Sequence, residues 1–195
     1  MRSTTRLARV TRFLTAVLCS SLASATVLSE ENTYPGPYIE HDDILVILIP
    51  HTPEQMSAFY EARGFPQAAR DLITQTCFVT VHIENKSREI IWLDLDQWAF
   101  SSSGKPLTRL DQSYWESQWN SINLRQASRS TFGWTQFPPL RDLQPDEPVG
   151  GNIVFPGNTT QFNMTLHMAT GKDKRGKQLS LEFRDINCPQ DEDNK

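Results

Sequence analysis

Two carboxylates lie between two tryptophans in the stretch WLDLDQW, residues 92–98. On a β-strand, Asp94 and Asp96 would point to the same side, with their carboxylates about 6.5 to 7 Å apart. That separation is near the lower limit for the catalytic pair of an inverting glycosidase, and Trp92 and Trp98 could form a platform for a sugar. Catalytic carboxylates usually face each other across a cleft, so we favour a ligand-binding or interaction surface made of these four residues over a hydrolase.

Histidine and methionine side chains are candidate copper ligands, because imidazole and thioether groups both bind this metal. His82 lies in the middle of an alternating stretch, and His167 lies in the segment NMTLHM. On a strand, the methionines of that segment point to one side and His167 to the other, so they cannot all reach one ion. His82 and His167 stay metal-ligand candidates through partners that folding could supply, including His41 and His51. The alternative for the methionines is core packing.

The cysteines point to architecture rather than to catalysis. Of three cysteines, Cys19 lies in the amino-terminal apolar segment, which leaves Cys77 and Cys188 in the rest of the chain. In an oxidising compartment such a pair favours a disulfide. It would close a loop of about 110 residues, for which the chain-entropy model gives on the order of 4 to 5 kcal/mol of stabilisation. The alternative is two unpaired, buried thiols.

The first 25 residues have the layout of a secretory signal peptide. Four arginines precede the apolar run FLTAVLCSSLASA, and Ala23 and Ala25 form a small-residue cleavage site. Cleavage after Ala25 would deliver a periplasmic or secreted protein. Two alternatives stay open. The arginine spacing also fits an amphipathic mitochondrial presequence, and Cys19 could carry a lipid, although Leu18 is bulkier than a lipobox prefers.

Charge argues against polyanionic partners. Removing the leader takes away four of the 19 basic residues and none of the 23 acidic ones, so the net charge goes from −4 to −8. Nucleic acid and anionic membrane surfaces both reward positive charge, so neither is an expected partner. No later apolar run reaches the roughly 18 residues that a membrane-spanning helix needs. The remaining length, about 170 residues, is that of one ordinary domain.

Patterns along the chain predict strands with short helices between them. Thr52, Pro53 and Gln55 have the types and spacing of a helix start with a capping box, and hydrophobic alternation with period two predicts most of the strands. The expected strands are at 44–49, 77–84, 89–100, 131–137, 152–156, 159–168 and 179–186, and the expected helices at 52–64, 66–76 and 111–127. The second and third strands read as an antiparallel hairpin. The predicted organisation is a signal peptide (1–25), a flexible lead (26–43), one domain (44–188) and a disordered acidic tail (189–195).

About seven strands with one polar side each, separated by turn signals, indicate a mainly β protein built as an antiparallel β-sandwich. The stretches VTVHIENKSREIIWLDLDQWAF, VGGNIVFPGNTTQFNMTLHM and LSLEFRD resemble bacterial exported proteins of unknown function that have an immunoglobulin-like sandwich. The resemblance covers residues 76–186. It implies an immunoglobulin-like β-sandwich with short helical insertions, and it implies no catalytic residues.

All five tryptophans lie between residues 92 and 134. They could fill space between the sheets and an inserted helix, or form an exposed aromatic patch for a partner. The motifs of serine hydrolases, zinc proteases and phosphate-binding loops are missing from the sequence. We therefore expect a non-enzymatic exported binding module without a cofactor, whose partner is a protein or a glycan of the cell envelope. Metal handling and glycoside hydrolysis are the alternatives.

Overall fold

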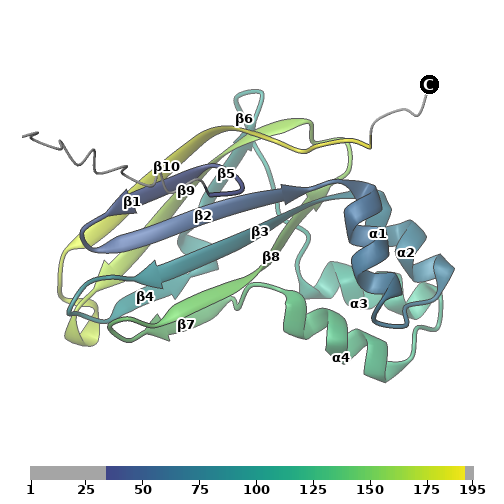
Figure 1. Cartoon of the computed structure of the whole chain (residues 1–195), viewed down its shortest axis with the longest axis horizontal. Coiled ribbons are helices and arrows are strands. Elements are labelled where there is room, and N and C mark those ends of the chain that lie inside the picture. Colours follow the sequence, from purple (N-terminus) through teal and green to yellow (C-terminus); the bar gives the residue numbers. More distant parts are fainter. Residues whose placement is uncertain (1–33, 192–195) are drawn as a thin grey trace, which may run out of the picture. The chain divides into compact units, whose positions relative to one another are not determined.

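The computed structural model describes residues 34–191. The predicted signal peptide, its possible lipid site at Cys19 and the last four residues lie outside this range. The described part is mainly β, with two antiparallel sheets and four short helices (Figure 1). None of the helices in residues 34–191 is long and apolar enough to cross a membrane.

The first sheet has the strand order β1-β2-β3-β8, and all neighbours are antiparallel. Its strands are β1 (Tyr38–His41), β2 (Ile44–His51), β3 (Thr76–Asn85) and β8 (Pro148–Pro156). The predicted strand at 44–49 is confirmed: residues 44–48 are buried, and Ile49 is partly buried. The predicted flexible lead, 26–43, lies partly outside the described residues. Within 34–43 it is not flexible: β1 pairs with β2, and the backbone N–H of Leu48 donates to the carbonyl of Pro37, just before β1, at 2.8 Å.

The second sheet is built around β9. One edge of β9 pairs with β10, and its other edge pairs with β5 and β4 in succession. Strands β6 and β7 complete the sheet beside β5 and β4. The bounds are β4 (Ile91–Asp94), β5 (Ala99–Ser102), β6 (Lys105–Pro106), β7 (Leu140–Leu143), β9 (Gln161–Thr170) and β10 (Gln178–Asn187).

The predicted hairpin between 77–84 and 89–100 is wrong, because β3 and β4 lie in different sheets. The side-chain amide of the buried Asn85 donates to the carbonyls of Glu89 and Leu143, at 2.7 and 3.0 Å. Its side-chain oxygen accepts from the backbone N–H of Ser87 at 2.9 Å. These hydrogen bonds hold the backbone of the segment between β3 and β4 in a conformation other than a simple hairpin turn. The chain therefore crosses to the other layer after Asn85.

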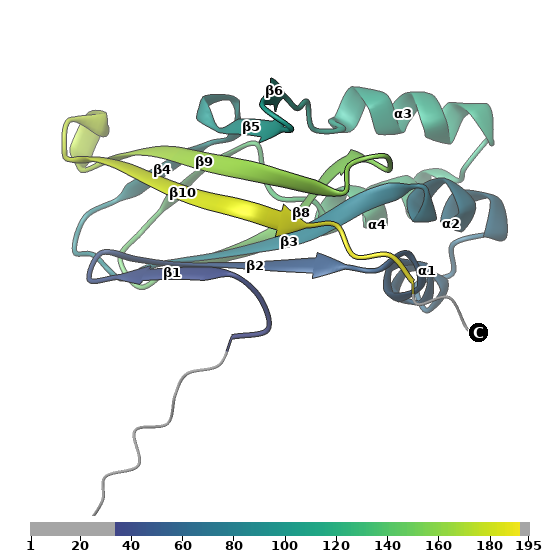
Figure 2. The same ribbon diagram turned by 90° about the horizontal axis from the view of Figure 1, so that it is seen from above.

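The two sheets share one hydrophobic core, and Figure 2 shows the two layers from the side. Alternation along each strand sends every second side chain into this core. On β3 these are Cys77, Val79, Val81 and Ile83, and on β9 they are Phe162, Met164, Leu166 and Met168. The methionines thus pack in the core, as the alternation predicts.

A second hydrophobic cluster lies between the first sheet and the helices, which gather at one end of the sheets (Figure 1). Phe78 and Val154 supply its sheet side, because they point away from the core that their neighbours fill. The helices are α1 (Pro53–Glu61), α2 (Gln67–Thr74), α3 (Gln112–Ser121) and α4 (Gln126–Thr135). The predicted capping box is present at α1, where the Thr52 hydroxyl accepts from Gln55 N–H and the Gln55 side chain accepts from Thr52 N–H.

The strand predicted at 131–137 is wrong, because most of it is the second half of helix α4. Ser128 and Phe132, four residues apart, are buried on one face of this helix, and the Thr131 hydroxyl donates to the Ala127 carbonyl at 3.0 Å. The single helix predicted at 111–127 is two helices, since α3 ends at Ser121 and α4 starts at Gln126. Burial of Phe132 among helix side chains outweighs the β-like local pattern.

Candidate functional site

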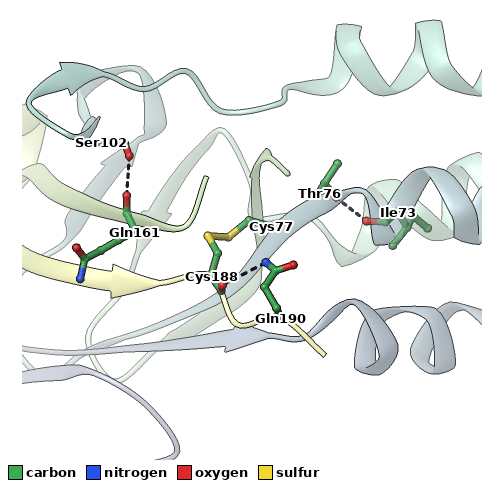
Figure 3. Close-up of a disulfide and its surroundings, with 7 residues drawn as sticks. All are labelled: Ile73, Thr76, Cys77, Ser102, Gln161, Cys188 and Gln190. Atoms are coloured by element: carbon green, nitrogen blue, oxygen red, sulfur yellow. Dashed lines mark hydrogen bonds between the residues drawn. A yellow bond between two sulfur atoms is a disulfide. The ribbon is translucent and has the colours of Figure 1, made fainter. Parts of the chain in front are cut away.

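The two cysteines form a disulfide that joins the two sheets (Figure 3). Cys77 lies at the start of β3 and Cys188 directly follows β10, with their Cα atoms 5.6 Å apart. Both side chains are buried, and the backbone N–H of Cys188 donates to the carbonyl of Thr160 at 2.9 Å. A buried cystine in a hydrophobic core has no access to a substrate, so this pair is architectural.

The stretch at 92–98 does not form one exposed face. Strand β4 ends at Asp94, because the Asp94 carboxylate accepts a hydrogen bond from Asp96 N–H at 3.1 Å and caps a short 3-10 helix (Leu95–Gln97). The alternation stops there. Trp98 consequently turns inward, where it is 6% exposed and packs on Phe137 with ring centroids 5.4 Å apart.

The other members of that stretch are tied to their own neighbours. Trp92 is half-buried, and its indole N–H donates to the carbonyl of Gly171 at 2.8 Å. Asp96 is exposed and pairs with Arg109 at 3.3 Å. Asp94 and Asp96 thus share a local turn rather than opposite walls of a cleft. A binding role for these residues stays a prediction, but the common platform expected from alternation is absent.

His82 and His167 cannot bind the same ion in this fold. His82 lies on β3 between the core residues Val81 and Ile83, and His167 lies on β9 between Leu166 and Met168. The neighbours of both histidines point into the shared core, so the two imidazoles project from the outer faces of opposite sheets. Within residues 34–191, no three histidine, cysteine or acidic side chains are grouped so that they could hold a metal.

A groove of about 1100 Å³ lies where helices α3 and α4 meet β8. Residues 109–111 before α3 and 136–139 after α4 complete its walls. The backbone of both segments is fixed to β8: Leu110 N–H donates to the Val154 carbonyl at 2.7 Å, and Phe137 N–H donates to the Asn152 carbonyl at 2.9 Å. This volume is slightly above the range of about 300 to 1,000 Å³ that is typical of small-molecule sites, so the groove has room for an extended ligand.

Aromatic rings form the buried lining of this groove. Trp115 and Trp119 stack with centroids 4.9 Å apart, and Phe132 from α4 lies 4.7 Å from Trp115. All three are almost fully buried. Rings packed at these distances and tilts are favourable beyond the area that they bury, so the two helices present a rigid apolar base.

Arg129 holds the two helical walls together. From α4 its guanidinium donates to the Glu116 carboxylate at 3.1 Å and to the Asn120 side chain at 2.6 Å, and it also reaches the backbone carbonyls of Trp119 and Leu124. A planar guanidinium can make several such bonds at once because its donors have a fixed geometry. The relative position of α3 and α4, and with it the groove, depends on this side chain.

Trp134 is the residue that the sequence analysis did not single out. It lines the groove from α4, and 90% of its surface is exposed. Gln126 and Ser130 line the groove from the same helix, so the three residues recur at a spacing of four and lie along one helix side. That spacing was visible in the sequence, but the prediction of a strand at 131–137 obscured it.

A polar network lies beside the groove and is connected to it through Asn152. The Thr80 hydroxyl donates to the side-chain oxygen of Asn152 at 2.6 Å, and the His51 imidazole lies 2.8 Å from the same hydroxyl. The Thr80 proton is thus directed at an amide and not at the imidazole. Burial lowers the pKa of His51 below its usual value. The network positions β2, β3 and β8 and does not activate Thr80 as a nucleophile.

Tyr60 is the buried aromatic residue of α1 beside this network. Its hydroxyl lies 2.7 Å from the Thr135 hydroxyl at the end of α4, and the Gln136 side chain donates to it at 3.4 Å. Burial raises the pKa of Tyr60 from 10.0 to about 12, so the neutral phenol persists well into the alkaline range. The contact fixes the end of α4 that carries Trp134.

Comparisons with known proteins find weak structural likeness. No protein-family model and no curated protein matches this sequence. A solved "putative lipoprotein (ycdA)" from Bacillus subtilis subsp. subtilis str. 168 is similar at 12% identity and a TM-score of 0.41, over 77% of this chain and 39% of that one. The yjhA protein from Bacillus subtilis is similar at 6% identity and a TM-score of 0.38, over 67% of this chain and 77% of that one. Neither match assigns a family or an activity.

Proposed function

We propose that this protein is an exported, non-enzymatic binding module that takes a protein or glycan of the cell envelope in the groove between α3, α4 and β8. The observation that carries the proposal is Trp134, a large aromatic side chain that is 90% exposed on the wall of a groove. Tryptophan is enriched among the residues that dominate binding energy, and an isolated exposed indole has no role in core packing.

Export is supported by the cystine. Disulfides persist in oxidising spaces such as the periplasm and the extracellular medium, and Cys77 and Cys188 are bonded here. We therefore propose the periplasm or the extracellular space as the location. The arginine-led first 25 residues fit this proposal, although they lie outside the described residues.

A binding role is favoured over catalysis by the chemistry of the groove. Its polar side chains are mainly amides, hydroxyls and paired ions, and the nearby Thr80 donates its proton to Asn152. The alternatives of metal handling and glycoside hydrolysis have no comparable support: His82 and His167 are on opposite sheets, and Asp94 and Asp96 are on one turn.

We also propose that the two layers form an immunoglobulin-like β-sandwich. In support, the orders β2-β3-β8 and β10-β9-β4-β7 are those of strands A-B-E and G-F-C-C′ of such domains. The disulfide differs from the usual bridge between strands B and F, because Cys188 follows the last strand. The fourth strand of the first sheet, β1, and the four helices are additions to that plan.

The proposal is tested by measuring the melting temperature of three proteins, each mixed with fractions of envelope extract. The three proteins are the wild type, Trp134→Ala and Tyr38→Ala. Tyr38 is a matched control, because it is an aromatic residue that is 48% exposed on β1, far in the fold from the groove. We expect a fraction that raises the melting temperature of the wild type and of Tyr38→Ala but not that of Trp134→Ala. Equal shifts for all three proteins, or none for any, would remove the groove as the binding site.

A further inference from the structure

We infer that the ligand of the groove is an uncharged oligosaccharide, a refinement that rests on the proposed function. A pyranose ring has one face of C–H groups and an edge of hydroxyls. A site for it needs a free aromatic surface, uncharged groups that both donate and accept hydrogen bonds, and no unpaired positive charge that would select an anion. The groove meets each of these requirements.

The free aromatic surface is the indole of Trp134. It makes no hydrogen bond or ring contact with any residue in 34–191. Trp115 and Trp119, in contrast, are stacked on each other and on Phe132. Of the tryptophans that line the groove, Trp134 is thus the one whose ring face is available to a C–H surface.

The uncharged hydrogen-bonding groups lie along the same wall and the facing one. Gln126 and Ser130 precede Trp134 at a spacing of four on α4, and Gln112 stands at the start of α3. All three side chains are exposed and make no hydrogen bond with residues 34–191. A carboxamide offers two donors and two acceptor sites, and a hydroxyl offers one donor and two. Vicinal sugar hydroxyls, which both donate and accept, match such groups.

The positive charges of the groove are already paired within the protein. Each arginine that lines it is paired with a carboxylate: Arg109 with Asp96, Arg129 with Glu116, and Arg141 with Glu147. Asp111 accepts from the backbone of Tyr114 and from the Ser113 hydroxyl, and these bonds lower its pKa. Asp111 therefore stays ionised and repels an anion, and no lining arginine is free to pair with one, so an uncharged ligand is favoured over an anionic ligand.

The backbone of the groove disfavours an extended peptide. Peptides often bind by adding a strand to an open sheet edge. The edge of β8 that faces the groove is closed, since the carbonyls of Asn152 and Val154 accept from Phe137 and Leu110. The wall is also too polar for the apolar face of an amphipathic helix, because Gln126 and Ser130 occupy it.

The test is isothermal titration of the folded protein with cellohexaose, chitohexaose, maltohexaose and mannohexaose, and with hexagalacturonate as an anionic probe. At least one of the uncharged hexasaccharides should bind, and the anionic one should not. Trp134→Ala should weaken binding at least about 10-fold. Gln126→Ala should weaken it by about 3-fold or more. Tyr38→Ala should bind like the wild type. Circular dichroism verifies that the variants fold, which is expected because both groove residues are exposed.

The outcomes separate the inference from the function beneath it. Binding of a protein that depends on Trp134, with no binding of any uncharged hexasaccharide, would overturn the oligosaccharide inference and leave the groove as a binding site. Binding of hexagalacturonate in place of the uncharged probes would overturn the inference too. Loss of all Trp134-dependent binding, to sugars and to envelope fractions alike, would overturn both.

Discussion

Cys77 and Cys188 are 111 positions apart in the sequence, and their bond ties the start of β3 in one sheet to the residue after β10 in the other. The bond also fixes the point where the chain leaves the second sheet. The terminal segment then runs toward α1, where the Asp191 carboxylate accepts from Glu54 N–H at 2.8 Å. Residues 189–191 of the tail that the sequence predicts to be disordered are thus placed against a helix start.

Removing this disulfide should lower stability substantially. A loop of this length corresponds to about 5 kcal/mol in the chain-entropy model. The double variant Cys77→Ala with Cys188→Ala should show this loss in urea unfolding monitored by fluorescence. Reductant should destabilise the wild type by a similar amount and leave the double variant unchanged. An unfolding midpoint that is the same for both proteins, with and without reductant, would contradict this expectation.

Tyr60 should make the protein sensitive to alkaline pH. Burial raises its pKa from 10.0 to about 12 in the folded state. Above pH 10 the phenol of the unfolded chain loses its proton while that of the folded chain keeps it, so stability falls as the pH rises from 10 to about 12, by about 1.4 kcal/mol per pH unit. Below pH 10 this contribution is fully present.

The variant Tyr60→Phe separates two effects of the Tyr60 hydroxyl on stability: its hydrogen bond and its titration at alkaline pH. At pH 8 the variant should be less stable by about 1 kcal/mol, because the hydrogen bond to Thr135 is lost. The difference should shrink above pH 10 and reverse near pH 11, since phenylalanine does not titrate. Urea unfolding of both proteins at pH 8, 10 and 11 measures this, with Tyr38→Phe as a control that retains Tyr60. Parallel pH profiles for wild type and Tyr60→Phe would show that this phenol does not cause the alkaline loss.

Arg129 should be important for the helical half of the molecule. Arg129→Met keeps most of the aliphatic length but leaves Glu116 and the carbonyls of Trp119 and Leu124 without their donor. We expect a loss of about 2 to 3 kcal/mol in the free energy of unfolding. Arg184→Met removes an exposed arginine paired with Glu182 and should leave the unfolding midpoint unchanged. A midpoint for Arg129→Met equal to that of Arg184→Met would contradict the role assigned to the guanidinium.

Gly150 and Gly151 are adjacent in β8, but only Gly151 should be sensitive to replacement by alanine. A Cβ on Gly151 would lie 2.5 Å from the backbone N of Phe137, whereas the nearest atom to a Cβ on Gly150 is 3.6 Å away. The backbone after α4 cannot yield easily, because Phe137 N–H is bonded to Asn152. Gly151→Ala should therefore cost about 1 to 3 kcal/mol and displace a groove wall, and Gly150→Ala should be tolerated. Equal melting temperatures for the two variants would argue against the close contact.

The sequence by itself determined the features that depend on residue types and on spacing along the chain. The capping box requires only two suitable side chains three positions apart, here Thr52 and Gln55, and it is present. Alternation in residues 159–168 predicted which side chains of β9 face the core, because strand geometry has a fixed period of two. The cystine was also predicted, since only two cysteines lie outside the segment that the sequence predicts to be a leader.

The tertiary structure decided the features that depend on contacts between distant residues. Asn85 binds the Leu143 carbonyl, 58 positions away, and this contact accompanies the crossing between sheets where the sequence predicted a hairpin. Residues 131–137 alternate like a strand, but Phe132 is buried against Trp115 and Trp119, which makes that segment part of a helix. The same packing leaves Trp134 outside. Local patterns show which residues are apolar. The free energy of burying them against residues far along the chain decides which of them are buried, as Phe132 is, and which face the solvent at the groove, as Trp134 does.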